Sequence, residues 1–384
     1  MPNSLDMTLT TQEIQALRQS CHSFLPGHFQ PAPADEFAAM AAWSADKNIA
    51  HDVYGDGSLV QEFEAQVAAL LGMEAAVFCI TGTLAQATAL RLACEPRSNR
   101  RVALHGSSHI LKHERSNFQL LYHFHALQIG DPFRPWTVND LKALAEPLAA
   151  AQYELPMREI GGQLPSWDAL ADIKTYCREQ NIHLHMDGAR LWEAACGFGK
   201  SLQEIAAGFD SVYVSFYKGI GGLGGAMLLG SAGFIAQAKV WMHRQGGNVY
   251  RRSPYVVSAA MQLEKRMAEM PAYFERTVWL YALLKSYPQF VPNPSAPHSN
   301  MLHVYLPVSS DRATDIRNHI AKEHGIWLFG RAVNTALPGQ CMFEWYVGDL
   351  LLQMPEDAVR TALDLLARAI GTPANIQDLG GALF

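Results

Sequence analysis

Asp187 and Lys218 are the two charged residues whose places in the sequence favour a chemical role. Residues 182–186 form a short apolar run that predicts a strand, and Asp187 follows directly, so its carboxylate should emerge where that strand ends. Residues 211–216 alternate Val and aromatic residues with Ser, which predicts a second strand, and Lys218 comes two residues after it. Open α/β sheets bind ligands at the carboxyl ends of their strands, so we expect the carboxylate and the amine to face one site.

A buried amine beside a buried carboxylate suits the chemistry of pyridoxal phosphate. The lysine would form a Schiff base with the cofactor, and the carboxylate would keep the pyridine nitrogen protonated, so that the ring accepts electrons. A glycine-rich segment after Lys218 predicts a flexible connection, with Gly219, Gly221, Gly222, Gly224 and Gly225. A structural ion pair, or a lysine on a surface loop, is the alternative for the same two residues.

Two short segments resemble one enzyme family. The sequence HMDGAR at residues 185–190 and the sequence SFYKG at residues 215–219 are similar to the corresponding segments of the threonine aldolase and β-eliminating lyase family of fold-type I pyridoxal phosphate enzymes. The resemblance covers residues 50–260 well and the remainder in outline. It implies an α/β fold, with a large domain built on a mostly parallel sheet and a small α+β C-terminal domain.

The turn Thr81-Gly82-Thr83 separates an apolar strand expected at residues 75–80 from a helix expected at residues 84–94. The free N–H groups in the first turn of a helix attract anions. Many strand-to-helix turns of this kind bind nothing, so the turn alone is a weak signal. Because the family carries a similar turn at this place, the resemblance implies that Gly82 and Thr83 hold the phosphate of the cofactor.

Five histidines crowd into residues 105–125, namely His105, His109, His113, His123 and His125. His109, His113 and Glu114 are candidate metal ligands on one helix, although the His-Glu-x-x-His pattern of zinc enzymes is absent from the sequence. A strand expected at residues 120–129 would contain the last two histidines. The resemblance implies instead that His109 stacks on the pyridine ring, with Glu114 near it. We therefore expect no metal site, and a histidine-based metal enzyme is the rival hypothesis from another class.

Residues 154–162 depart from the pattern of the family. The family places Glu-Asn-Thr-His before a glycine pair, and that histidine acts on the β-hydroxyl of the substrate. Here Glu154 is retained but Met157 takes the position of the histidine, and a thioether cannot accept a proton. Glu159, or else Arg158 or an ordered water, would replace the histidine, unless the substrate lacks this hydroxyl.

The resemblance also assigns roles to Tyr54 and to three arginines. The loop that carries Tyr54 closes over the cofactor, often that of the neighbouring subunit, and Arg252 meets the phosphate. Arg190 follows Asp187 by three residues and would bind the substrate carboxylate as a bidentate fork. Arg331 is the nearest substitute for the family's second carboxylate-binding arginine. A surface turn for Tyr54 and solvated side chains for the arginines are the alternatives.

Composition argues against two kinds of partner. The net charge of −6 and the scattered Lys and Arg residues argue against nucleic acid, and no apolar run approaches the roughly 18 residues of a membrane span. The 6 cysteines include no Cys-x-x-Cys pair and predict buried free thiols. We expect a cytoplasmic homodimer or homotetramer that acts on a small amino acid, with the active site at the subunit interface, as the resemblance implies.

A chain of 384 residues is long enough for two domains of unequal size. Within the larger domain we expect helices at residues 140–151 and 191–205, and a capping box in which Ser58 and Gln61 begin a helix. The expected organisation is an N-terminal arm and linker at residues 1–49, a large cofactor-binding domain at 50–262 and a small C-terminal domain at 263–384.

The function that these observations predict together is that of a pyridoxal phosphate-dependent carbon–carbon lyase. It would cleave a β-hydroxy-α-amino acid, such as threonine or allo-threonine, by a retro-aldol reaction to glycine and an aldehyde. The residues expected to act in catalysis are Lys218, His109, Asp187 and Glu159. β-Elimination on a related amino acid is the alternative within the same family.

Overall fold

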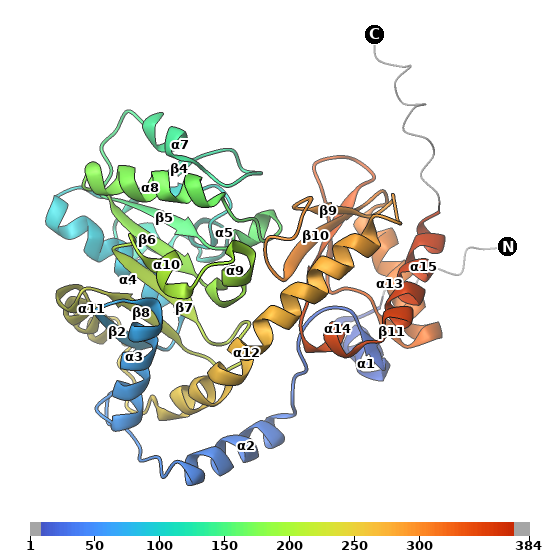
Figure 1. Ribbon diagram of the computed structural model, residues 1–384, viewed down its shortest axis with the longest axis horizontal. Coiled ribbons are helices and arrows are strands. Elements are labelled where there is room, and N and C mark those ends of the chain that lie inside the picture. Colours follow the sequence, from blue (N-terminus) through green and yellow to red (C-terminus); the bar gives the residue numbers. More distant parts are fainter. Residues whose placement is uncertain (1–8, 372–384) are drawn as a thin grey trace. The chain divides into compact units, whose positions relative to one another are not determined.

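A computed structural model describes residues 9–371 of the chain (Figure 1). Contacts divide these residues into two units, a larger one at residues 31–270 and a smaller one that combines the residues up to Gln30 with those from Pro271 onwards. The division falls inside helix α12 (Ser253–Leu284). The domain boundaries expected after residues 49 and 262 remain a prediction. Each unit has a sheet and a hydrophobic core of its own.

The larger unit is built on a seven-stranded sheet with the strand order β2-β8-β7-β6-β5-β3-β4. Strand β8 runs antiparallel to both of its neighbours, and the other adjacent pairs are parallel, which confirms the expected mostly parallel sheet. Strands β5 to β8 are buried along their whole length, as in sheets covered on both faces. The strands are β2 (Ala75–Cys79), β3 (Arg101–His105), β4 (His125–Ile129), β5 (Ala150–Glu154), β6 (His183–Gly188), β7 (Ser211–Ser215) and β8 (Ala226–Gly230).

Helices of the larger unit pack on this sheet: α4 lies against β7 and β8, and α8 lies against β6. The α-helices are α2 (Pro33–Asp46), α3 (Ser58–Leu71), α4 (Gly82–Cys94), α5 (His109–His113), α6 (Asn117–Leu120), α7 (Val138–Lys142), α8 (Trp167–Glu179), α9 (Leu191–Phe198), α10 (Leu202–Ala206) and α11 (Ala232–Arg244). Two short 3-10 helices, η1 (Glu95–Arg97) and η2 (Arg158–Ile160), complete the set.

Two elements expected between β3 and β6 are wrong. The helix expected at residues 140–151 ends at Lys142 as α7, and β5 begins at Ala150. Short apolar runs do not distinguish a buried strand from a buried helix by periodicity, and here pairing with β3 and β6 decides in favour of the strand. The strand expected at residues 120–129 begins only at His125, because α6 precedes it and His123 has a left-handed φ of 57°.

Glycines account for two further differences from expectation. Residues 191–205 form two helices rather than one, because Gly199 ends α9 in the left-handed conformation, with φ of 61°, and Ser201 caps α10. The capping box expected from Ser58 and Gln61 is wrong, because Ser58 already lies inside α3 and Gly57 occupies the N-cap position.

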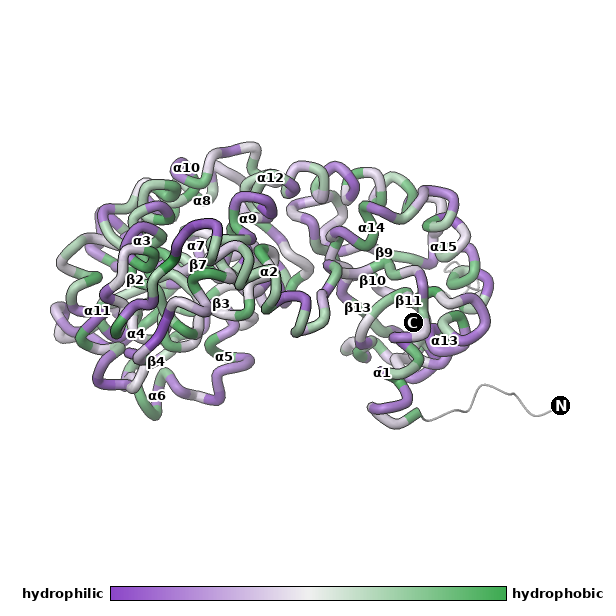
Figure 2. The backbone as a smooth tube through the Cα atoms, turned by 90° about the horizontal axis from the view of Figure 1, so that it is seen from below, coloured by the Kyte–Doolittle hydropathy of each residue, from purple (hydrophilic) through white to green (hydrophobic). Residues whose placement is uncertain are grey.

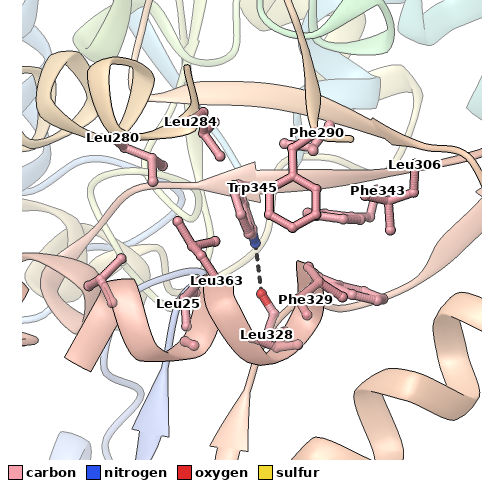
Figure 3. Close-up of a cluster of buried hydrophobic side chains, with 14 of the residues drawn as sticks. Leu25, Leu280, Leu284, Phe290, Leu306, Leu328, Phe329, Phe343, Trp345 and Leu363 are labelled. Carbon is pink, nitrogen blue, oxygen red and sulfur yellow. Dashed lines mark hydrogen bonds between the residues drawn. The ribbon is translucent and has the colours of Figure 1, made fainter. Parts of the chain in front are cut away.

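The smaller unit has a four-stranded antiparallel sheet with the order β12-β13-β10-β9, which confirms the expected small α+β domain. Its core contains Leu280 and Leu284 of α12 and Phe343 and Trp345 of β13, and the Trp345 indole N–H donates to the Leu328 carbonyl at 2.7 Å (Figure 3). Hydrophilic residues dominate α13 (Figure 2), and its buried Ala313, Ile316 and Ile320 pack into this core. The elements are α1 (Thr11–Ser20), β1 (Ser23–Phe24), β9 (Val291–Asn293), β10 (Met301–Leu306), α13 (Ser310–His324), β11 (Ile326–Trp327), β12 (Ala332–Asn334), β13 (Cys341–Tyr346), α14 (Asp349–Gln353) and α15 (Glu356–Ile370).

Candidate active site

Asp187 and Glu154 lie side by side at the carboxyl ends of two parallel strands. The register pairs Glu154 of β5 with Asp187 of β6, and the two residues are only 8% and 1% exposed. Asp187 Oδ1 accepts the backbone N–H of Ala189 at 3.1 Å, and Glu154 Oε1 accepts that of Arg158 at 3.0 Å. The second Glu154 oxygen, Oε2, is buried and has no hydrogen-bond partner among the described residues. Two carboxyl groups therefore lie next to each other in the protein interior.

Burial raises the pKa of both carboxyl groups, but their surroundings differ. The charge of Asp187 raises the pKa of Glu154 further. The positive charges of Lys218 and His109 oppose the rise in the pKa of Asp187, as do hydrogen bonds from Ala189 and Gln86. The positive charges of Lys218 and Arg190 likewise oppose the rise in the pKa of Glu154. Because two adjacent buried carboxylates disfavour each other's charge, the pair binds a proton more tightly than either group would alone.

Lys218 supplies an unpaired amine to the same place. It follows β7 by three residues, and its Nζ makes no hydrogen bond or ion pair with another described residue, lying 5.5 Å from the centre of the Tyr217 ring. Burial lowers the pKa of Lys218 to about 8, helped by the charge of Arg190 and opposed by that of Asp187. A buried lysine with a lowered pKa is a nucleophile near neutral pH, because part of it is uncharged.

The glycine segment behind Lys218 is a folded turn. The Gly221 N–H donates to the Lys218 carbonyl at 3.0 Å, and the Gly222 N–H donates to the Phe216 carbonyl at 2.7 Å. Gly225 has φ of 94°, and a Cβ at this position would lie 2.2 Å from the ring of Phe78. Only glycine fits there, so the close contact between this turn and β2 holds the lysine segment in position.

Helix α5 brings His109 and His113 to the site, one helical turn apart. His109 Nδ1 is hydrogen-bonded to Glu114 Oε1 at 3.1 Å, and this bond raises the pKa of His109 against the effect of burial. The charges of Asp187 and Lys218 also act on the His109 ring, which places it beside them. His113 Nε2 lies 3.0 Å from Glu159 Oε1, and the two imidazole rings are 5.1 Å apart.

The first turn of α4 presents free N–H groups on Gly82 and Thr83. The Thr81 side chain caps the helix by accepting the Leu84 N–H at 3.2 Å. Gly82 is buried against the Tyr213 hydroxyl, which would lie 2.1 Å from a Cβ at this position. Because a helix of this length concentrates positive potential at its N-terminus, the turn is suited to a phosphate group.

Arg252 lies beside the strand that leads into this turn. Its guanidinium donates to the Phe78 carbonyl of β2 at 3.3 Å and to the Asn248 side chain, while its Nε is buried and has no hydrogen-bond partner among the described residues. Asp52 holds the backbone of this segment by accepting the Arg252 N–H at 2.9 Å. An arginine donor is therefore available near the start of α4.

The other residues that the sequence predicted for the site lie in different structural environments. Arg190 stands at the N-cap of α9, its charge acts on Lys218, and its buried Nε lacks a hydrogen-bond partner among the described residues. Tyr54 is 52% exposed and packs edge-on against Tyr250 at 5.3 Å. Arg331 belongs to the smaller unit and is exposed directly before β12. Met157 is fully buried, so its thioether packs in the interior.

Three features of the site were missed by sequence reasoning. Gln86 of α4 accepts a hydrogen bond from Gln152 at 2.6 Å and is hydrogen-bonded to Asp187. Tyr213 covers Gly82, and its hydroxyl lies 3.2 Å from that of Tyr217. The pairing of His113 with Glu159 was missed as well. None of these contacts follows from local spacing, although the step of four residues from His109 to His113 does place both histidines on one face of a helix.

Residues 9–371 contain neither a candidate metal centre nor a candidate membrane span. No group of three or more His, Cys, Asp or Glu residues is arranged to hold a metal ion in this part of the chain. None of the helices described there has both the length and the apolar character needed to cross a membrane.

The fold and the site together define a class of protein, and comparison with known sequences agrees with it. The sequence model of the β-eliminating lyase family matches residues 34–306, which is most of the chain. The chain belongs to this family. The central sheet, with its antiparallel β8, and the small antiparallel C-terminal sheet give it the expected architecture of fold-type I pyridoxal phosphate enzymes.

Solved structures and sequence relatives show which members of the family the chain resembles. A putative L-allo-threonine aldolase from Listeria monocytogenes is 38% identical, with a TM-score of 0.86 over 94% of this chain and 98% of that one. A putative aromatic amino acid β-eliminating lyase/threonine aldolase from Exiguobacterium sp. is 35% identical, with a TM-score of 0.87 over 92% and 99%. The low-specificity L-threonine aldolase of Eremothecium gossypii is 31% identical over 222 residues, 54% of this chain and 56% of that protein. The chain thus spans little more than half the length of that relative.

Proposed function

We propose that the protein is a pyridoxal phosphate-dependent lyase that cleaves a β-hydroxy-α-amino acid, such as threonine or allo-threonine, to glycine and an aldehyde. The observation that carries the proposal is the unpaired Lys218 amine beside the buried Asp187 carboxyl group at the carboxyl ends of β6 and β7. The same pair in a member of the β-eliminating lyase family supports a cofactor that needs one amine and one carboxylate.

The buried polar atoms that lack partners fit pyridoxal phosphate. Lys218 would attach the cofactor, Asp187 would hold the proton of the pyridine nitrogen, and His109 would stack on the ring. The N–H groups of Gly82 and Thr83, with the free Nε of Arg252, would bind the phosphate. When bound, the cofactor stabilises negative charge at the substrate Cα.

The protein residues would orient the substrate and move its protons. Arg190, whose Nε has no partner among the described residues, would bind the substrate carboxylate, with Arg331 as the second arginine. Lys218 Nζ, with its lowered pKa, would transfer the proton at Cα. Glu159 would take part, directly or through a neighbouring group, in removing the proton of the β-hydroxyl, in place of the histidine that Met157 replaces.

The proposal includes a cytoplasmic homodimer or homotetramer with the active site at the subunit interface. Tyr54 and Tyr250 support this, because they form an exposed aromatic pair on the surface of the larger unit. All six cysteines are free thiols, as in proteins of reducing compartments.

Product analysis tests the reaction. The purified protein, loaded with pyridoxal phosphate, should release glycine and acetaldehyde from threonine or allo-threonine, and borohydride reduction should add the mass of the cofactor to the peptide that contains Lys218. Label on another lysine would contradict the site. Formation of a keto acid and ammonia without glycine would establish the β-eliminating alternative.

A further inference from the structure

Helix α5 presents two imidazole–carboxylate pairs in succession. His109 is paired with Glu114, whose side chain is only 1% exposed, and His113 is paired with Glu159. The His113 side chain is 42% exposed, whereas the Glu114 carboxylate is buried. The His109 side chain is 38% exposed as well, so a small molecule can reach both imidazoles. The charges of Asp187 and Lys218 act on His109, and the His113 ring centre lies 5.1 Å from that of His109.

Glu159 is itself held in place. Its Oε1 accepts from the Arg158 guanidinium at 3.0 Å, in addition to its contact with His113. The backbone N–H of Arg158 donates to Glu154, the partner of Asp187 in the buried carboxyl pair. The 154–159 segment thus connects the end of β5 to the His113 ring.

The hydrogen bond with Glu159 fixes the tautomer of the His113 imidazole. A carboxylate accepts only, so Nε2 of His113 carries a proton, and in the neutral imidazole Nδ1 keeps its lone pair. No described residue is hydrogen-bonded to Nδ1. A carboxylate that already accepts from a guanidinium and from an imidazole N–H is a poor acceptor for a further proton, whereas a neutral imidazole held by a carboxylate is the usual arrangement of a general base.

We propose that His113 Nδ1 accepts the proton of the substrate β-hydroxyl, and that Glu159 is a positioning residue for His113. This inference rests on the proposed retro-aldol reaction. The hydroxyl proton passes to Nδ1, its bonding electrons form the aldehyde carbonyl, and the Cα–Cβ bond breaks with its electron pair left on the glycine half. A proton delivered to Cα completes glycine, so no other reactant is consumed.

The deciding experiment compares two reactions of the same loaded enzyme. Threonine cleavage needs a base at the β-hydroxyl, whereas exchange of the glycine α-proton in deuterated water, followed by NMR, needs none. His113→Gln and His113→Phe should lower kcat for cleavage by about 10²–10⁴-fold and leave glycine exchange within about twofold of the wild-type rate. His125→Gln, at the exposed start of β4, is the matched control and should leave both unchanged.

Each outcome has a separate meaning. If both His113 variants cleave threonine within about threefold of the wild-type rate, the inference is overturned while the proposed function stands. Equal losses in cleavage and in exchange would overturn it as well, since they would indicate damage to the whole site. If the wild-type enzyme exchanges glycine protons but releases no glycine from threonine, the proposed function itself fails.

A measurement that does not depend on activity tests the role of Glu159. Nitrogen-15 NMR should find His113 protonated at Nε2 in the wild-type protein and a mixture of tautomers in Glu159→Leu. Glu159→Gln should keep the tautomer, because its amide oxygen still accepts, yet lose about tenfold in kcat, because the charge is gone. Glu159→Asp should recover part of that loss. A wild-type His113 protonated at Nδ1 would contradict the assignment.

Discussion

At the scale of single residues, burial decides which groups carry protons. Glu154 and Asp187 occupy adjacent buried positions, and burial raises the pKa of both carboxyl groups. Lys218 is buried as well, and its lowered pKa makes it a nucleophile. The site thus combines a pair of carboxyl groups that binds protons readily with an amine that is partly uncharged.

The charge of Asp187 is the first residue-level prediction. Asp187→Asn preserves the shape of the side chain but cannot balance a protonated pyridine nitrogen. We expect the variant to retain bound cofactor, measured by its visible absorbance, and to lose on the order of 10²–10³-fold in kcat. Asp168→Asn, on the exposed first turn of α8, is the control. Near-normal turnover in Asp187→Asn would refute this role.

The second residue-level prediction concerns pH. Because the pKa of Lys218 is lowered to about 8, its amine becomes uncharged as the pH rises through that value. The rate at which the cofactor-free protein attaches pyridoxal phosphate should therefore rise with pH up to about 8 and then level off, as followed by stopped-flow absorbance. An ordinary lysine, with a pKa of about 10.4, would give a rate that still rises between pH 9 and 10. Such a rise would contradict the prediction.

At the scale of elements, strand ends and tight turns place the groups. Strands β5, β6 and β7 are adjacent and parallel, so Glu154, Asp187 and the segment of Lys218 emerge at one edge of the sheet. The start of α4 and the Arg252 segment meet at the end of β2. The turn behind Lys218 depends on a close backbone approach that only glycine permits, at Gly225.

Gly225 provides the element-level prediction. Gly225→Ala would put a methyl group into the Phe78 ring at a backbone φ of 94°, which alanine tolerates poorly. We expect a loss of about 1–3 kcal/mol, seen as a lower midpoint in thermal or urea unfolding, together with weaker cofactor binding. Gly233→Ala in α11 is the matched control: nothing lies within 4 Å of its Cβ, so the change should be neutral or mildly stabilising. Equal midpoints for the two variants would contradict the argument.

At the scale of the whole molecule, the described residues form two units with separate cores, and most expected site residues lie in the larger one. Arg331 is the exception, since it belongs to the smaller unit. Tyr54 lies on the surface of the larger unit, and its proposed partner is the cofactor of a neighbouring subunit. The proposed role of Tyr54 therefore depends on the assembly of subunits into an oligomer.

Subunit complementation tests that dependence. Tyr54→Ala and Lys218→Ala should each be inactive or nearly so when purified separately. If Tyr54 serves the neighbouring subunit, a hybrid contains one intact site, and random exchange between dimers should restore about a quarter of the wild-type activity. No recovery, in a mixture shown by mass spectrometry to contain hybrids, would mean that Tyr54 acts within its own subunit.

Local patterns in the sequence determined the parts of the site that lie close together along the chain. The strand before Asp187, the strand before Lys218 and the turn at Gly82 were predicted, because strand alternation and turn residues are local properties. The mostly parallel sheet was expected from the family resemblance and is confirmed. Strand β5 was not predicted, because its short apolar run is ambiguous until neighbouring strands pair with it.

Only the tertiary structure decided how distant residues act on one another. Glu154 meets Asp187 through strand pairing, and Glu159 meets His113 across 46 residues of sequence, so neither contact follows from local spacing. The proton affinities depend on burial, which arises only when the elements pack. The sequence therefore named the amine and the carboxylate, and folding decided which second carboxyl group lies beside that carboxylate and which imidazole the 154–159 segment contacts.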